Sequence, residues 1–177
     1  MLKNMIKSKP LIILVSLLCP WLAEHTSVAG AIEPYEGSLN QPGIRLQDLD
    51  HRLHSLADYR DKVILVNFWA SWCIPCVTEM PGMQRLADTL KDQPFEILAI
   101  NVSDTENRIR EFLKRMDLRL TILMDRDGEA FKAWQGKVLP ASFLLDRSGR
   151  IRYQVIGPLE WDSDEAGKII EELLQHP

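Results

Sequence analysis

Cysteine is scarce in this chain of 177 residues, which contains only Cys19, Cys73 and Cys76. Beyond residue 31 only the last two remain, whereas a small secreted domain held together by disulfides would contain several pairs. A lone bridge between two residues so close in sequence would constrain little of the unfolded chain. The sequence therefore argues against a disulfide-stabilised scaffold, and the Cys73/Cys76 pair needs another explanation.

A second pair of cysteines, which a structural zinc site would commonly use, is also lacking. A tetrahedral zinc site needs four ligands, often two such pairs or one pair with two histidines. His51 and His54 are close in sequence and could in principle contribute, but their alternating segment is more typical of solvated surface histidines. We therefore expect no metal ion and no cofactor.

Basic clusters are missing after the first nine residues. Beyond residue 31 the chain keeps 18 of its 21 Lys and Arg residues and 24 of its 25 Asp and Glu residues, a net charge of −6. Nucleic acids and anionic membrane surfaces attract proteins with positive patches. The charge balance thus predicts no nucleic-acid partner.

A long apolar run is absent as well, since the most apolar segment covers only the thirteen residues 11–23. A bilayer-spanning helix needs about 20 such residues. Lys3, Lys7 and Lys9 precede this run, and Ala29-Gly30-Ala31 follows it, which are the parts of a secretory signal. We interpret residues 1–31 as a cleaved signal peptide or an uncleaved N-terminal membrane anchor, with Cys19 as an apolar filler. Both alternatives place the rest of the chain outside the cytoplasm.

Residues 32–42 are polar and rich in turn-forming residues, and we expect them to be a linker before one domain at 43–177. A short hairpin is expected around Asp50-His51, followed by the buried strand 63–70. Further strands are expected at 95–103, 120–124, 141–146 and 151–156, and helices at 74–91, 106–116, 128–134 and 161–175. This order predicts an α/β fold with a parallel core and a closing antiparallel hairpin.

Cys73 follows the expected end of the strand at Ala70 by three residues and precedes a helix. Reactive groups in such sheets lie at the carboxyl ends of parallel strands. The helix N-terminus presents free amide groups and a positive dipole end, which favour a thiolate. Pro75 fits the first helical turn, where a missing N–H costs little. The pair therefore suits a thiol that attacks, Cys73, and a thiol that resolves, Cys76.

The run Trp-Ala-Ser-Trp-Cys-Ile-Pro-Cys at 69–76, after an apolar strand, resembles the thioredoxin superfamily. The following Glu79-Met80-Pro81, the N-terminal export segment and the late run LPASFLLDRSG at 139–149 are similar to the TlpA/ResA/CcmG branch of exported thiol–disulfide oxidoreductases. The resemblance covers roughly residues 43–175 and implies a thioredoxin-like fold, with a central mixed sheet flanked by helices.

The resemblance also implies roles for individual residues. Cys73 matches the exposed attacking cysteine, Cys76 the buried resolving cysteine, and Glu79 an acid that tunes the thiols and handles protons. A solvated acid at the helix start is the alternative for Glu79. Pro140 matches a proline that, in the cis form, holds substrate backbone. The predicted substrate-binding residues are Trp72, Pro75, Leu139 and Pro140.

Asn67 departs from ordinary cytoplasmic thioredoxins, which carry a buried aspartate at this position. Asparagine cannot shuttle a proton, so Glu79 is the nearest residue for that task, while Asn67 itself can simply be a hydrogen-bonded core residue.

The resemblance implies a reductase of disulfides in exported proteins, recycled by a membrane electron donor, for example in cytochrome c maturation. A copper-delivery protein and a peroxidase of the redoxin type are the alternatives. The latter would need the pattern P-x-x-x-T-x-x-C, which the chain does not contain.

Overall fold

The structure is a computed structural model that describes residues 30–37 and 42–175. Most of the expected export segment, with Cys19, lies outside the described residues, as does His176. Within the described part of the chain, no helix combines the length and the apolar character needed to cross a membrane.

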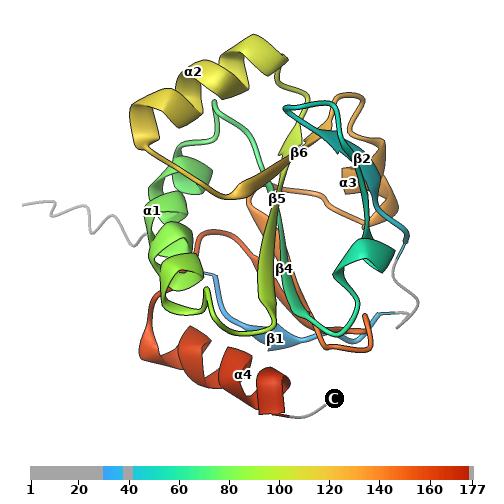
Figure 1. Ribbon diagram of the computed structural model, residues 1–177, viewed down its shortest axis with the longest axis vertical. Helices are drawn as coiled ribbons and strands as arrows, with labels where there is room; N and C mark the ends of the chain where they lie inside the picture. Colours follow the sequence, from blue (N-terminus) through green and yellow to red (C-terminus); the bar gives the residue numbers. More distant parts are fainter. Residues whose placement is uncertain (1–29, 38–41, 176–177) are drawn as a thin grey trace, which may run out of the picture.

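A mixed sheet forms the centre of the molecule, between the helices (Figure 1). It has eight strands in the order β1-β8-β7-β4-β5-β6-β2-β3. Strands β4, β5 and β6 are parallel, and the other pairings are antiparallel. The strands are β1 (Glu33–Pro34), β2 (Arg45–Asp48), β3 (Leu53–Ser55), β4 (Val63–Trp69), β5 (Phe95–Val102), β6 (Thr121–Asp125), β7 (Ala141–Leu145) and β8 (Ile151–Ile156). The predicted mixed sheet is confirmed.

Strand β4 lies inside the sheet, between β7 and β5, and all seven of its residues are buried, as its nearly continuous apolar sequence predicts. Alternate side chains of a strand point to opposite faces. Ile64, Val66 and Phe68 pack into one cluster, whereas Val63 and Leu65 pack into another on the opposite face. Packing against apolar clusters on both faces therefore fixes the position of the strand and of its carboxyl end.

Helices cover both faces of the sheet. Helices α1 (Ile74–Thr89), α2 (Glu106–Met116) and α4 (Asp164–Gln175) pack on the face of Val63 and Leu65, and α3 (Glu129–Ala133) lies on the other face with the short 3-10 helix η1 (Leu56–Tyr59) (Figure 1). The helices expected from apolar periodicity are all present. This arrangement places the N-terminus of α1 at the carboxyl end of β4.

The segment expected to be a linker is partly built into the sheet. Glu33 and Pro34 form β1 and pair with Gln154 and Tyr153 of β8, and the Tyr35 amide bonds to Arg152 O at 2.9 Å. The sheet therefore begins earlier in the chain than the expected domain start at residue 43. The polar composition of 32–42 concealed this because an edge strand of two residues needs no apolar pattern.

Candidate active site

The two cysteines lie where the chain turns from β4 into α1. The Cys73 amide donates to Ala70 O at 3.1 Å, which closes the turn, and Cys73 is the N-cap of the helix. Cys73 and Cys76 form a disulfide, with their Cα atoms 5.3 Å apart. Cys73 is 5% exposed and Cys76 is fully buried. The expected exposed attacking cysteine is therefore the more accessible of the two, but in the disulfide state it is largely covered.

The start of α1 favours negative charge on Cys73 Sγ. The backbone amide of Cys76 donates to this sulfur at 3.3 Å, and Pro75 lies in the first turn, as predicted. The first turn of α1 contains no acidic residue that would oppose a thiolate. Amide donors and the positive end of a helix lower the pKa of a thiol.

The loop before Cys73 is anchored by a buried carboxylate that sequence reasoning missed. Asp104, which follows β5, accepts from the Ser71 amide at 2.7 Å and from the Ser71 hydroxyl at 3.0 Å. Asn101 Nδ2 donates to the same carboxylate at 2.9 Å, and Arg108 Nε lies 3.5 Å from it. Three donors and a cation satisfy this buried charge, so that the backbone leading to Cys73 is fixed.

Glu79 is buried on the same helix, three residues beyond Cys76, and only 5% exposed. Its Oε1 accepts from Asn67 Nδ2 at 2.8 Å, and its Oε2 accepts from the Leu159 amide at 3.1 Å and from Trp161 Nε1 at 3.3 Å. Burial raises the pKa of Glu79 to about 7, although these three hydrogen bonds act in the opposite direction. The alternative of a solvated acid at the helix start is thus wrong, because the sheet and the loop after β8 cover the side chain.

Asn67 is fully buried in β4 and connects Glu79 to the segment after Pro140. Its Nδ2 also donates to Ser142 Oγ at 2.9 Å, whereas its Oδ1 has no partner among the described residues. The interpretation of Asn67 as a hydrogen-bonded core residue is confirmed. The residue also holds a carboxylate whose pKa lies near neutrality.

The residues expected to contact substrate come from two segments, the turn into α1 with the first turn of that helix, and the two residues directly before β7. The Leu139–Pro140 peptide bond is cis, as the resemblance implied, and Leu139 packs against the cluster that contains both cysteines. Pro140 is buried, while Pro75 is exposed and Trp72 is 59% exposed. Trp69, in contrast, is fully buried in the core, where its ring is tilted by 41° to that of Phe112 with the ring centroids 5.0 Å apart.

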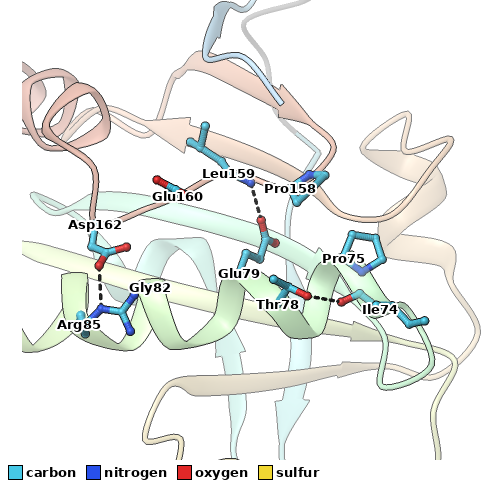
Figure 2. A pocket seen from close by; sticks show the side chains of 10 residues that line it. All are labelled: Ile74, Pro75, Thr78, Glu79, Gly82, Arg85, Pro158, Leu159, Glu160 and Asp162. Atoms are coloured by element: carbon cyan, nitrogen blue, oxygen red, sulfur yellow. Dashed lines mark hydrogen bonds and ion pairs between the residues drawn. The ribbon is translucent and has the colours of Figure 1, made fainter. Parts of the chain in front are cut away.

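A groove of about 610 Å³ runs along α1 beside the disulfide. Figure 2 shows α1 on one side, with Ile74, Pro75, Thr78 and Gly82, and the loop Pro158–Asp162 on the other. Glu79 lies between the two walls and its bond to the Leu159 amide crosses the groove (Figure 2). Sequence reasoning missed this loop, because its contacts with Glu79 join residues 80 and 82 positions apart.

The two histidines weighed as zinc ligands are used differently. His51 is exposed, as expected, but His54 is half-buried: its Nδ1 lies 2.6 Å from the Tyr59 hydroxyl and its Nε2 lies 2.9 Å from Asp48 Oδ2. The prediction that His54 is a solvated surface residue is therefore wrong, since the β2–β3 hairpin folds over η1. Among residues 30–37 and 42–175, no group of three or more His, Cys, Asp or Glu side chains is arranged to hold a metal ion.

A thioredoxin-like sheet with a Cys-x-x-Cys disulfide at a helix N-terminus and a cis-proline directly before β7 defines a thiol–disulfide oxidoreductase. Comparison with known proteins agrees with this class. The model of the AhpC/TSA family matches residues 40–154, and the chain belongs to this family. The peroxidase pattern would place threonine three residues before the reactive cysteine, where the chain has Ala70.

Relatives with curated names are thiol–disulfide oxidoreductases. The chain is 37% identical over 118 residues to the thiol–disulfide oxidoreductase ResA of Geobacillus thermodenitrificans, which covers 67% of this chain and 68% of the relative. The ResA protein of Bacillus subtilis is 30% identical over 149 residues, 83% of each chain. Among solved structures, a thiol:disulfide interchange protein DsbE from Chlorobium tepidum, described as putative, superimposes with a TM-score of 0.70 at 28% identity, covering 75% of this chain and 94% of that one.

Proposed function

We propose that this protein is an extracytoplasmic reductase that passes electrons to disulfides of exported proteins. The observation that carries the proposal is the Cys73–Cys76 disulfide at the N-terminus of α1, with the buried Glu79 three residues after Cys76. The names of the ResA and DsbE relatives support exchange chemistry. Cytochrome c maturation is one process that would use such a reductase.

The reaction would begin from the dithiol form. The Cys73 thiolate attacks one sulfur of a substrate disulfide, forms a mixed disulfide and releases the first substrate thiolate. Cys76 then loses its proton and attacks Cys73 Sγ, which releases the second substrate thiolate and leaves the Cys73–Cys76 disulfide. Two electrons and two protons pass to the substrate. A membrane protein that supplies electrons must then reduce the disulfide again.

Glu79 is proposed to exchange the proton of Cys76. A carboxyl group whose pKa is about 7 is present in both protonation states near neutral pH, which suits an acid–base group. Asn67, the Leu159 amide and Trp161 orient it through the three hydrogen bonds that it accepts. Trp72, Pro75, Leu139 and Pro140 are proposed to contact the substrate around the disulfide.

The redox state of the cysteines in cells tests the direction of electron flow. Cells are quenched with acid and their free thiols are labelled with a large alkylating reagent that changes mobility. We expect Cys73 and Cys76 to be mainly reduced, and to become oxidised when electron supply from the membrane is removed. A pair that stays oxidised with the supply intact would favour an oxidase.

Fusing residues 1–31 to a reporter that is active only outside the cytoplasm tests the location.

A further inference from the structure

The loop between β8 and α4 supplies two of the three hydrogen bonds that Glu79 accepts. The Leu159 amide and Trp161 Nε1 both donate to Oε2, at 3.1 and 3.3 Å, whereas Asn67 holds Oε1. The Leu159 amide is a backbone group that any residue except proline would provide. The indole N–H, in contrast, depends on the identity of residue 161.

We propose that Trp161 is a positioning residue for Glu79, whose indole N–H fixes Glu79 Oε2 and stabilises the ionised carboxylate. The proposal adds a residue to the proposed function. It depends on that function in one respect only, that the ionisation of Glu79 affects the reactivity of the thiols. Trp161 does not touch the reacting sulfur atoms in this role. It acts through the carboxyl group.

Three features hold Trp161 in place. Its side chain is fully buried in the cluster that contains Val63, Met83 and Ile170. The neighbouring Asp162 pairs with Arg85 of α1, with Nε and Oδ2 2.6 Å apart, and Figure 2 shows this pair at one end of the groove. Gly82 permits this close approach, since a Cβ atom there would lie 2.7 Å from Asp162 Oδ1. The indole is therefore a rigid donor rather than a mobile one.

The charged groups near Glu79 are paired with each other or exposed. Hydrogen bonds are therefore the main interactions that stabilise the ionised Glu79 carboxylate. Arg85 on α1 and Asp162 on the loop form an ion pair with each other, and Glu160 is exposed. On the sheet side Glu79 faces the neutral Asn67, with Ser142 behind it, and on its own helix the Cys73–Cys76 disulfide carries no charge. A donor to the charged form lowers the pKa of a carboxyl group, against the effect of burial.

The direct test is a pH titration of Glu79 in the oxidised full-length protein, where neither Cys73 nor Cys76 titrates, monitored by NMR of glutamate labelled with ¹³C at the carboxyl carbon. In Trp161→Phe, we expect the pKa of Glu79 to rise by roughly half a unit to one unit, since one hydrogen bond to the anion is lost. Trp134→Phe is the matched control: Trp134 is also buried, and its Nε1 has no partner among the described residues. Equal Glu79 titrations in both variants and the unsubstituted protein would overturn the proposal.

A second measurement needs no core substitution at residue 161. In the unsubstituted protein the ¹⁵N resonance of the Trp161 indole should shift with the same midpoint as the Glu79 carboxyl, and this shift should vanish in Glu79→Gln. An indole resonance that ignores the Glu79 titration would contradict the proposal. If Trp161→Phe moves the Glu79 titration but leaves the pH profile of the reduced thiols unchanged, the positioning role stands, and the coupling assumed in the proposed function fails.

Discussion

Asn67 Nδ2 donates to Glu79 Oε1 across 2.8 Å in the core below the disulfide. The amide is a neutral neighbour that satisfies one carboxylate oxygen without adding charge. Asn67 also reaches Ser142, two residues after the cis-proline, at 2.9 Å. Strands β4 and β7 and the helix with the cysteines are thus joined through one polar group.

This relationship predicts that Asn67→Asp makes the free energy of unfolding depend more strongly on pH. Two carboxyl groups at hydrogen-bonding distance in a buried site must share one proton, so that the pKa of one of them is raised strongly. We expect the free energy of unfolding to fall by about 2 kcal/mol or more between pH 5 and pH 9, relative to the unsubstituted protein. Urea denaturation of the oxidised protein at both pH values measures it.

The matched control is the double variant Asn67→Asp/Glu79→Gln, which contains only one carboxyl group at the site. The extra pH dependence should disappear in this variant, as a double-mutant cycle would show. If the single and the double variant lose stability equally between the two pH values, the two side chains are not coupled.

Glu79→Gln should be relatively more stable at alkaline pH. The folded protein holds the proton of Glu79 up to a pKa of about 7, above the ordinary value of 4.5, so folding favours the protonated form. The contribution to stability is complete below pH 4.5 and is lost as the pH rises to 7. We therefore expect the difference in unfolding free energy, variant minus unsubstituted protein, to increase by about 3 kcal/mol from pH 4 to pH 8.

Denaturation of the oxidised proteins in urea measures this difference. Glu171→Gln on α4 removes an exposed carboxyl group and should show no comparable change. A difference between Glu79→Gln and the unsubstituted protein that stays constant with pH would mean that Glu79 ionises as a solvent-exposed acid does.

The sequence predicted the features that depend on local patterns. The apolar run of β4 predicted a strand buried on both faces, and the position of the Cys73/Cys76 pair at a helix start was predicted as well. Both predictions were possible because strand ends and helix caps have short-range sequence signals. The long-range bonds of Glu79 left no such signal. Trp161 was expected only as the first residue of a helix, yet the loop bends back and aims its indole at a residue 82 positions earlier.

Other misses have the same cause. His54 was judged by its alternating segment, but its burial depends on Tyr59 and on the way the hairpin folds over η1. The strand β1 exists because Glu33 and Pro34 pair with the edge of β8, which a sequence pattern of two residues cannot reveal.

Cys73 should be the more reactive thiol in the reduced protein. The amide of Cys76 and the helix N-terminus favour its thiolate, and Cys76 is fully buried. Cys76→Ala, which keeps Cys73, should therefore react with iodoacetamide at least roughly tenfold faster at pH 6.5 than Cys73→Ala, because a lowered pKa leaves more thiolate. Rates measured across pH give both pKa values. Faster labelling of Cys76 at low pH would reverse the two roles.

Trp72→Ala should weaken substrate binding with little effect on stability. The side chain is 59% exposed directly before Cys73, and exposed aromatic residues contribute strongly to protein contacts. We expect kcat/KM for a protein disulfide to fall about tenfold, mainly because KM rises. The loss of one contact that contributes somewhat more than about 1 kcal/mol of binding free energy would have this effect. Leu53→Ala is the control, because Leu53 is 50% exposed on the distant edge strand β3. Equal losses in both variants would remove Trp72 from the substrate site.

We propose that Cys73 attacks substrate disulfides and that Cys76 releases the substrate, and covalent trapping distinguishes these two roles. Cys76→Ala is expressed in cells with the native partners, thiols are blocked at harvest, and the complexes are separated without reductant and identified by mass spectrometry. We expect reductant-sensitive complexes of Cys73 with exported proteins, because release requires attack by the resolving thiol. Cys73→Ala/Cys76→Ala should give none. Complexes that form with Cys73→Ala and not with Cys76→Ala would show that Cys76, and not Cys73, is the attacking cysteine.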